Sequence, residues 1–246
     1  ERIMSNFDFE KILDTSDEWI RTMTGVEERR FAAPEEATSD LCVKAAEKAL
    51  TVAGMTIEDI DMIIVATVTP DYPVQSTACL VQYKMGARNV PSFDVNAACS
   101  GFIYSLTIAG SMIRSGIYKN VLVIGAEVLS RILDMTNRSN CILFGDGAAA
   151  AVVSEVEEGY GMLSTYLGAK GEDDYILKIP AGGSKKPNDA DTIANRENFL
   201  VMKGSEVFKF AVHALPSATN KALKIANVKS EELKMIFPHQ ANVRII

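Results

Sequence analysis

The sequence predicts an α/β protein in which helices cover a largely parallel sheet. Residues 62–66, Met-Ile-Ile-Val-Ala, form an apolar run without polar alternation, which is typical of a strand covered on both faces. Helix and strand patterns alternate as far as residue 153, as βαβ units require. A stretch that begins at Lys48 recurs from Lys221, which indicates a duplicated helix–turn–strand unit.

The predicted elements follow one another along the chain. A helix over 39–53 has apolar residues at helical spacing, Thr38 or Ser39 as its cap and Gly54 as its left-handed stop. Gly145-Asp146-Gly147 is interpreted as a tight turn between two buried strands. Further helices are expected near 75–86, 100–115 and 205–226, and further strands near 91–95, 120–125, 141–144, 148–153 and 234–237.

The internal repeat pairs residues 48–63 with residues 221–236. Seven of these sixteen pairs are identical, and the helix stop recurs because Asn227 takes the place of Gly54. We therefore expect an N-terminal half over 1–165 and the start of a C-terminal half over 166–246. The second half is expected to be truncated, and the polar stretch 181–198 to be a surface loop between the halves.

Composition narrows the classes of protein that the chain can belong to. The chain has 246 residues, 48% of them hydrophobic and 23% charged, as in an ordinary soluble domain. The net charge of −7 argues against a broad nucleic-acid surface. The uncharged run 95–113 contains several Ser, Thr, Asn and Gly residues, so we expect a buried helix and no membrane span. The chain has no start Met or signal-like opening, and we treat it as a fragment.

The four cysteines, Cys42, Cys79, Cys99 and Cys141, form no CxxC pair, which favours a reduced, cytoplasmic protein without a metal site. Cys99 stands where a buried strand leads into an apolar helix. The free N–H groups of a helix start lower a cysteine pKa from about 8.5 and could hold an oxyanion. The alternative for Cys99, as for the other three, is a small buried apolar side chain.

Two histidines are the candidates for a base that would act with this cysteine. His213 falls inside the predicted helix 205–226 and is interpreted as an ordinary helix residue. His239 follows the predicted strand 234–237 at the strand tip, where α/β folds build their sites. A capping or hydrogen-bonded structural role is the alternative for His239. From residue chemistry alone, a cysteine nucleophile with a histidine partner is the hypothesis, and a cysteine peptidase competes with it.

Two basic features could meet a phosphate-bearing ligand. One is Arg21 with Arg29-Arg30 around Trp19, and the other is Arg138. A solvated charged face is the alternative for both. No GxGxxG or GxxxxGK[ST] nucleotide motif occurs.

Four motifs in this order carry a resemblance to a known family. They are Asp-Thr-Ser-Asp-Glu-Trp-Ile over 14–20, Ala-Ala-Cys-Ser-Gly-Phe over 97–102, Phe-Gly-Asp-Gly-Ala over 144–148 and Pro-His-Gln-Ala-Asn over 238–242. The chain resembles the β-ketoacyl-[acyl-carrier-protein] synthase III family of the thiolase superfamily. This resemblance implies a thiolase-like duplicated αβαβα layered fold, a homodimer and a cytoplasmic enzyme of fatty acid synthesis.

The resemblance also implies a reaction. An acyl-CoA, most simply acetyl-CoA, acylates Cys99, and malonyl-acyl carrier protein then loses carbon dioxide and attacks to give 3-oxoacyl-acyl carrier protein. His239 would hydrogen-bond the malonyl thioester carbonyl. The family's third site residue, an asparagine, is expected beyond this chain. Coenzyme A thioester is a substrate here, and neither a separate cofactor nor a metal is implied.

The remaining site residues come from the resemblance as well. Val74 would line an acyl pocket across the dimer, and its small side chain suggests room for primers longer than acetyl. The sequence has Met23 where many relatives carry an arginine, which puts one phosphate or ribose contact in question. The residues implied for CoA and its pantetheine arm are Trp19, Thr24, Arg138, Gly204, Phe208, Ala241 and Asn242, and those implied for the acidic carrier protein are Lys209 and Arg244.

Three alternatives to this function stay open at the level of the sequence. Another thiolase-superfamily enzyme, such as a thiolase, a hydroxymethylglutaryl-CoA synthase or a polyketide starter enzyme, would use the same cysteine. A catalytically silent homologue would bind acyl groups or serve as a dimer partner. A cysteine peptidase would cleave peptides and would not bind CoA.

Overall fold

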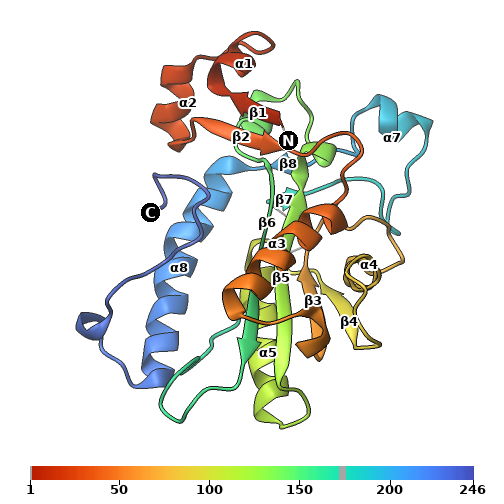
Figure 1. Ribbon diagram of the computed structural model, residues 1–246. Coiled ribbons are helices and arrows are strands. Elements are labelled where there is room, and N and C mark those ends of the chain that lie inside the picture. Colours follow the sequence, from red (N-terminus) through yellow and green to blue (C-terminus); the bar gives the residue numbers. More distant parts are fainter. Residues whose placement is uncertain (1, 172–175) are drawn as a thin grey trace. The chain divides into compact units, whose positions relative to one another are not determined.

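The computed structural model describes residues 2–171 and 176–246 (Figure 1). Contacts between Cα atoms divide the chain into two compact units. The first unit consists of residues 32–128 and 146–163, and the second of residues 2–31, 129–145 and 164–246. The change of unit after Leu163 lies beside the predicted division at 165, but residues 2–31 and 129–145 group with the C-terminal residues.

A four-stranded sheet forms the centre of the first unit. Its strands are β3 (Met62–Ala66), β4 (Ser92–Val95), β5 (Asn120–Val128) and β6 (Asp146–Ser154), in the order β4-β3-β5-β6. Strand β3 is parallel to both of its neighbours, whereas β6 runs antiparallel to β5. All five residues of β3 are buried, so the predicted doubly covered strand is confirmed.

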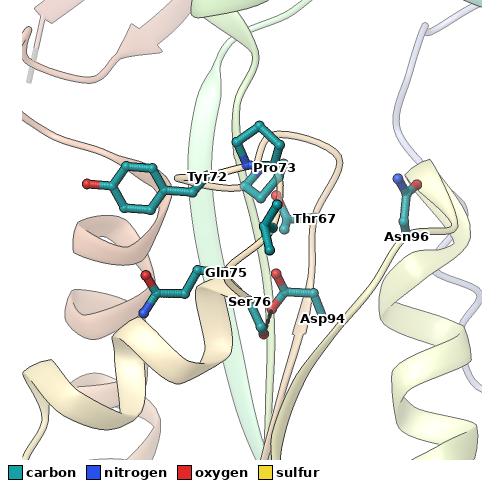
Figure 2. Close-up of a pocket in the computed structure, with 9 residues that line it drawn as sticks. Thr67, Tyr72, Pro73, Gln75, Ser76, Asp94 and Asn96 are labelled. Carbon is teal, nitrogen blue, oxygen red and sulfur yellow. Dashed lines mark hydrogen bonds between the residues drawn. The ribbon is translucent and has the colours of Figure 1, made fainter. Parts of the chain in front are cut away.

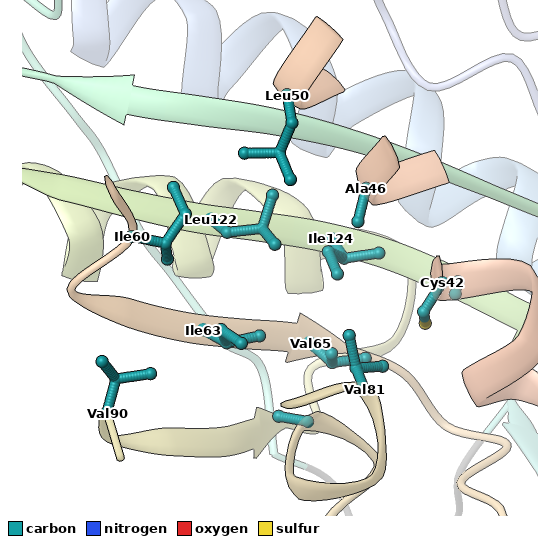
Figure 3. Close-up of a cluster of buried hydrophobic side chains, with 12 residues drawn as sticks. Cys42, Ala46, Leu50, Ile60, Ile63, Val65, Val81, Val90, Leu122 and Ile124 are labelled. Carbon is teal, nitrogen blue, oxygen red and sulfur yellow. The ribbon is translucent and has the colours of Figure 1, made fainter. Parts of the chain in front are cut away.

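Helices cover both faces of this sheet. Helix α3 (Thr38–Ala53) and helix α4 (Thr77–Lys84) pack on one face, where Figure 3 shows side chains of α3 above the strands. Helix α5 (Gly101–Arg114) packs on the other face. Because side chains alternate along a strand, Ile63 contributes to the α3 side and Ile64 to the α5 side. The predicted layered α/β arrangement follows from this double burial.

The predicted cap of α3 is wrong, although its stop is confirmed. Ala37 is the N-cap and has no side-chain oxygen, and its N–H donates to Asp40. The hydroxyl of Ser39 donates to Asp71 at 2.6 Å instead of capping the helix. Gly54 ends the helix in the left-handed region with φ +65°, as expected.

The segment predicted as a strand near 141–144 is not one. It contains the end of the short helix α6 (Arg138–Cys141), whose N-cap Asn137 accepts a hydrogen bond from Ser139 N–H. The apolar residues Cys141 and Ile142 are buried in the core of the second unit. Strand β6 begins at Asp146, so the Gly-Asp-Gly stretch is not a turn between two strands.

The second unit contains the remaining strands and α-helices. Strand β1 (Arg2–Ser5) pairs antiparallel with β2 (Glu28–Phe31), and β7 (Leu177–Lys178) pairs with β8 (Val201–Met202). Its core includes Phe9, Ile20 and Leu200. The helices are α1 (Asn6–Glu10), α2 (Asp17–Thr24), α6, α7 (Ala190–Ala194) and α8 (Gly204–Ala226), and the short 3-10 turns of the chain are η1 (Ile57–Asp59), η2 (Ala98–Ser100), η3 (Leu129–Ile132) and η4 (Ser230–Glu232).

The repeat holds for the helix and its stop but not for the strand. Helix α8 confirms the predicted helix 205–226 and ends at Asn227 with φ +54°, the counterpart of Gly54. The predicted strand 234–237 is wrong, because no strand in the described ranges pairs with it, and Phe237 is 82% exposed. Within 181–198, predicted as a loop, α7 is helical because Asp189 caps it by accepting the Thr192 N–H.

No helix in the described parts of the chain has the length and apolar character needed to cross a membrane.

Candidate active site

Cys99 lies where β4 leads into α5, as the sequence predicts. It belongs to the turn η2, and its side chain is exposed. Ala98 before it has φ +45°, a left-handed conformation that is uncommon outside glycine. Gly101 lets α5 approach the sheet closely, because a Cβ at this position would lie 3.0 Å from the Cβ of Ala66. The close packing of α5 on the end of β3 thus presents Cys99 at the carboxyl edge of the sheet.

The surroundings of Cys99 raise the pKa of its thiol above the ordinary value. Although part of the side chain reaches solvent, protein atoms displace much of the water around it, and this desolvation is the main cause. The carboxyl group of Glu127 contributes a smaller effect of the same sign. A backbone hydrogen bond lowers the pKa, the direction expected of a helix start, but desolvation outweighs it, so the net shift is upward and Cys99 carries its proton at neutral pH.

Glu127 is a part of this region that sequence reasoning missed. It lies near the end of β5, and its carboxylate accepts the Val68 N–H at 2.9 Å and the Thr69 hydroxyl at 2.7 Å. Desolvation raises the pKa of Glu127 more than these hydrogen bonds lower it. The carboxyl group ties the segment that leaves β3 to the end of β5. The only sequence signal for the role of Glu127 is that a single acidic residue stands at the end of an apolar strand.

A hollow of about 310 Å³ lies beside the segment that connects β3 to α4. Figure 2 shows Ser76 and Asp94 facing each other, with Asn96 on the far side of the hollow. Asp94 accepts hydrogen bonds from the Ser76 hydroxyl at 2.7 Å and from the Thr77 N–H at 2.7 Å, which anchors the segment at the start of α4. The hollow is lined by Thr67, Pro70, Tyr72, Pro73, Val74, Gln75, Ser76, Asp94 and Asn96.

Val74, the residue predicted for an acyl pocket, lies on this anchored segment. Its side chain is 98% exposed and that of Tyr72 is 58% exposed. Asp71 fixes the middle of the segment by accepting the Ser39 N–H at 2.8 Å. The segment therefore holds an apolar side chain out into solvent on a constrained backbone.

In the second unit, the structure brings together Trp19 and Arg138. The guanidinium carbon of Arg138 lies 5.0 Å from the centre of the indole ring, and the same side chain bonds the carbonyl oxygen of Asp14. Trp19 is a large apolar side chain that is 38% exposed. An aromatic face beside a guanidinium can bind a flat heterocycle with a phosphate nearby.

In the other predicted basic feature, protein groups engage Arg29 and Arg21. Arg29 is buried, and its Nε donates to the carbonyl oxygen of Ile142 at 2.8 Å, while a second nitrogen bonds Asn6. Burial lowers the pKa of Arg29 to about 10. Arg21 pairs with Asp17 at 2.9 Å on the surface. These interactions serve the fold of the second unit.

His239 lies in the segment after η4, and its side chain is exposed. Nearby protein atoms still remove enough water to lower the pKa of the imidazole below its ordinary value of 6.5. His239 is therefore neutral at pH 7 and can donate one N–H and accept at its other nitrogen. His213 lies in the middle of α8, as expected.

Other predicted residues of the second unit gather along the start of α8 and the end of the chain. Gly204 is the first residue of α8, and Lys209 is exposed one turn further on. The guanidinium of Arg244 lies 5.9 Å from the ring centre of Phe208. Ala241 is exposed.

Thr24 lies at the end of α2 and is buried. Its hydroxyl donates to the Ile20 carbonyl oxygen at 2.7 Å and accepts the Val26 N–H at 3.0 Å, so its polar group is engaged within the fold. Cys99 and Val74 thus belong to the first unit, and the other predicted site residues belong to the second. In the described part of the chain, no three His, Cys, Asp or Glu side chains gather closely enough to hold a metal ion.

Comparisons with known proteins give the family. The profile of 3-Oxoacyl-[acyl-carrier-protein (ACP)] synthase III matches residues 93–171, and that of Stage V sporulation protein AD matches residues 14–130. Beta-ketoacyl-[acyl-carrier-protein] synthase III of Fusobacterium nucleatum subsp. nucleatum is 62% identical over 246 residues, which are 100% of this chain and 75% of that protein.

Solved structures agree with the sequence comparison. The 3-oxoacyl-[acyl-carrier-protein] synthase III of Aquifex aeolicus VF5 superposes with a TM-score of 0.89 at 47% identity, over 100% of this chain and 75% of that one. The corresponding enzyme of Thermus thermophilus gives 0.90 at 44%, with the same coverage. Identity at this level along the whole chain shows that this protein, with its thiolase-like α/β fold, belongs to the beta-ketoacyl-[acyl-carrier-protein] synthase III family.

Proposed function

We propose that this protein catalyses the decarboxylative condensation of an acyl-CoA with malonyl-acyl carrier protein, which initiates fatty acid synthesis. The observation that carries the proposal is the 62% identity to a beta-ketoacyl-[acyl-carrier-protein] synthase III along the whole chain. The exposed Cys99 at a strand-to-helix junction supports it, because this geometry suits a nucleophile that attacks a thioester. Family membership also argues against a cysteine peptidase.

Cys99 acts in the first step. The thiol loses its proton, its sulfur attacks the carbonyl carbon of the acyl-CoA, and the C–S bond to coenzyme A breaks. The departing thiolate takes up a proton, so the products are an acyl-Cys99 thioester and the free thiol of coenzyme A. Backbone N–H groups of η2 and the start of α5 are the donors for the oxyanion that forms in between. Since the pKa of Cys99 is raised, proton removal is part of this step.

His239 acts in the second step. The malonyl group loses carbon dioxide, and the electron pair of the broken C–C bond is left as an enolate on the thioester. The neutral His239 donates an N–H to the enolate oxygen and stabilises it. The enolate carbon then attacks the acyl-Cys99 carbonyl and releases the Cys99 thiolate, and the product is 3-oxoacyl-acyl carrier protein. An asparagine outside this chain is expected to share the task of His239.

The second unit supplies the substrate contacts in this proposal. Trp19 offers a ring face to the adenine of coenzyme A, and Arg138 beside it offers its guanidinium to the phosphates. Lys209 and Arg244 present positive charge to the acidic carrier protein, despite the net charge of −7. Coenzyme A thioester enters as a substrate, and no separate cofactor is part of the proposal.

We also propose that the enzyme is a cytoplasmic homodimer. The exposed Val74, on a segment that Asp71 and Asp94 anchor, is suited to enter the acyl pocket of a partner subunit. Four free cysteines suit a reducing compartment. Light scattering and cell fractionation test these two points, and a monomer or a membrane-bound protein contradicts them.

Mass spectrometry tests the reaction. The enzyme is mixed with acetyl-CoA and a panel of longer and branched acyl-CoAs, digested and analysed. We expect an acyl mass shift confined to the Cys99 peptide, and the best substrate identifies the primer. A folded enzyme that gains no acyl group from any of these donors contradicts the proposal and favours a silent homologue.

A further inference from the structure

The segment that carries His239 is attached to the end of α2. We call residues 238–246 the histidine loop. The side-chain amide of Asn242 donates to the carbonyl oxygen of Met23 at 3.0 Å, and the N–H of Val243 donates to the carbonyl oxygen of Thr24 at 3.1 Å. Both acceptors belong to the last turn of α2, whose final carbonyl groups have no partner within the helix. The histidine loop thus satisfies the end of α2.

The oxygen of the Asn242 side-chain amide also forms a hydrogen bond within the protein. Its Oδ1 accepts the N–H of Arg244 at 2.8 Å, which fixes a local turn in the histidine loop. The side chain of Arg244 continues across the same surface, where a guanidinium nitrogen lies 3.9 Å from the sulfur of Met23. The Asn242 amide therefore bridges α2 and the histidine loop and is engaged at both its oxygen and its nitrogen.

Gly25 allows the histidine loop to come this close. It ends α2 with φ +78°, and its N–H donates to the carbonyl oxygen of Arg21 at 2.8 Å. A Cβ at this position would lie 2.9 Å from the Cβ of Val243 and 3.2 Å from its Cγ1. Contacts this short are not tolerated, so any larger residue has to push Val243 away. Glycine is required here both for the backbone conformation and for the space.

We infer that Gly25 and Asn242 are positioning residues that set where His239 stands for the decarboxylation step, an inference that rests on the proposed function. His239 lies three residues before Asn242 and four before Val243 on one short loop. A side chain at residue 25 pushes the histidine loop away from α2. Because His239 is part of this loop, its imidazole moves with it. Stabilisation of an enolate depends on the donor standing within a few tenths of an ångström of its place. Acylation of Cys99, by contrast, does not use the His239 N–H in the proposed mechanism.

The test separates the two half-reactions. In Gly25→Ala, we expect the rate of carbon dioxide release from malonyl-acyl carrier protein to fall by about 10- to 100-fold. Acylation of Cys99 at saturating acetyl-CoA should stay within about threefold of wild type, because any effect on CoA binding appears in KM. Asn242→Ala introduces no backbone strain and should also slow carbon dioxide release; since Asn242 is also implied in CoA binding, acylation is compared with wild type only in Gly25→Ala. Equal losses in both half-reactions of Gly25→Ala, or no loss of decarboxylation in either variant, overturn the inference.

Gly54→Ala is the matched control. Gly54 ends α3 in the same left-handed conformation, with φ +65°, but apart from its two chain neighbours no atom of the described residues lies within 4 Å of the place a Cβ would occupy. Alanine there carries the same left-handed conformational cost as alanine at residue 25, without displacing a neighbour. Both half-reactions of Gly54→Ala should match wild type. A loss of decarboxylation in this control overturns the inference, because strain alone then accounts for the effect.

Nuclear magnetic resonance distinguishes failure of this inference from failure of the proposed function. The imidazole signal of His239 is assigned by its loss in His239→Gln. In Gly25→Ala and Asn242→Ala this signal should move, whereas that of His213 should not. If wild type neither acylates nor decarboxylates but the His239 signal moves, the function is wrong and the positioning holds. An unmoved His239 signal overturns the positioning whatever the activity.

Discussion

The guanidinium carbon of Arg138 lies 5.0 Å from the centre of the Trp19 indole ring, although 119 residues separate them in the sequence. Helix α2 supplies the ring and α6 supplies the cation. This pair is the physical basis of the proposed CoA site, since adenine stacks on an aromatic face and the guanidinium faces phosphate.

Trp19→Ala should therefore weaken CoA binding. Loss of a base–aromatic stack costs about 1–3 kcal/mol, so we expect Kd to rise by about 5- to 150-fold. Isothermal titration calorimetry measures this value. Tyr83→Ala is the control, because Tyr83 is 85% exposed on the first unit and should leave Kd unchanged. Equal Kd values for CoA in the two variants would show that Trp19 does not bind CoA.

The raised pKa of Cys99 predicts how its alkylation depends on pH. A thiol with a raised pKa is protonated at pH 7, so its reaction with iodoacetamide should accelerate with pH to a midpoint above the ordinary pKa of a cysteine. In Glu127→Gln one nearby carboxylate is lost, and this midpoint should move to lower pH. Peptide mass spectrometry follows Cys99 separately from the buried Cys42 and Cys141. A midpoint below the ordinary value would show that the helix start dominates after all.

His239→Ala should impair decarboxylation more than acylation. Removing one donor from a developing negative charge lowers the rate by about 10²- to 10³-fold. Release of carbon dioxide and acyl transfer to Cys99 are measured separately, with His213→Ala as the control from the middle of α8. Equal loss of both half-reactions in His239→Ala would contradict the separate roles of the two residues.

Arg29→Ala should destabilise the fold. The mutation leaves the Ile142 carbonyl and the Asn6 side chain without a charged donor in a buried place, and each such hydrogen bond is worth about 1.5–3 kcal/mol. A loss of about 3 kcal/mol or more in the free energy of unfolding is expected by urea denaturation. Arg30→Ala, on the exposed side of the same strand β2, should change it by less than about 1 kcal/mol. Similar losses in both variants would contradict the buried role of Arg29.

Val74→Phe should narrow the choice of primer. Since Val74 is 98% exposed, the larger side chain has no effect on stability, but in the proposed dimer it fills part of the acyl pocket. We expect kcat/KM for branched and longer acyl-CoAs to fall by about tenfold relative to acetyl-CoA. An unchanged ratio would mean that this segment does not reach the acyl group.

The sequence by itself determined the elements whose pattern is local. The apolar run of β3, the periodic helix ended by Gly54 and the strand-to-helix junction at Cys99 are all predicted correctly, because propensity, periodicity and capping act over a few residues. The ordered motifs that include Trp19 and His239 were sufficient to indicate the family that the comparisons show.

Tertiary structure decided everything that depends on partners distant in the sequence. Residues 234–237 match the β3 pattern, yet a strand needs a neighbour to bond, and none in the described ranges pairs with them. Arg29 is an ordinary surface cation in the sequence, and only the carbonyl of Ile142 makes its burial possible. The pKa of Cys99 likewise depends on water displaced by packed atoms, which outweighs the local helix field. Burial and strand pairing are properties of the folded chain. A polar side chain can be buried where it finds a hydrogen-bond partner, and a segment with a strand pattern forms no strand where it lacks a neighbouring strand.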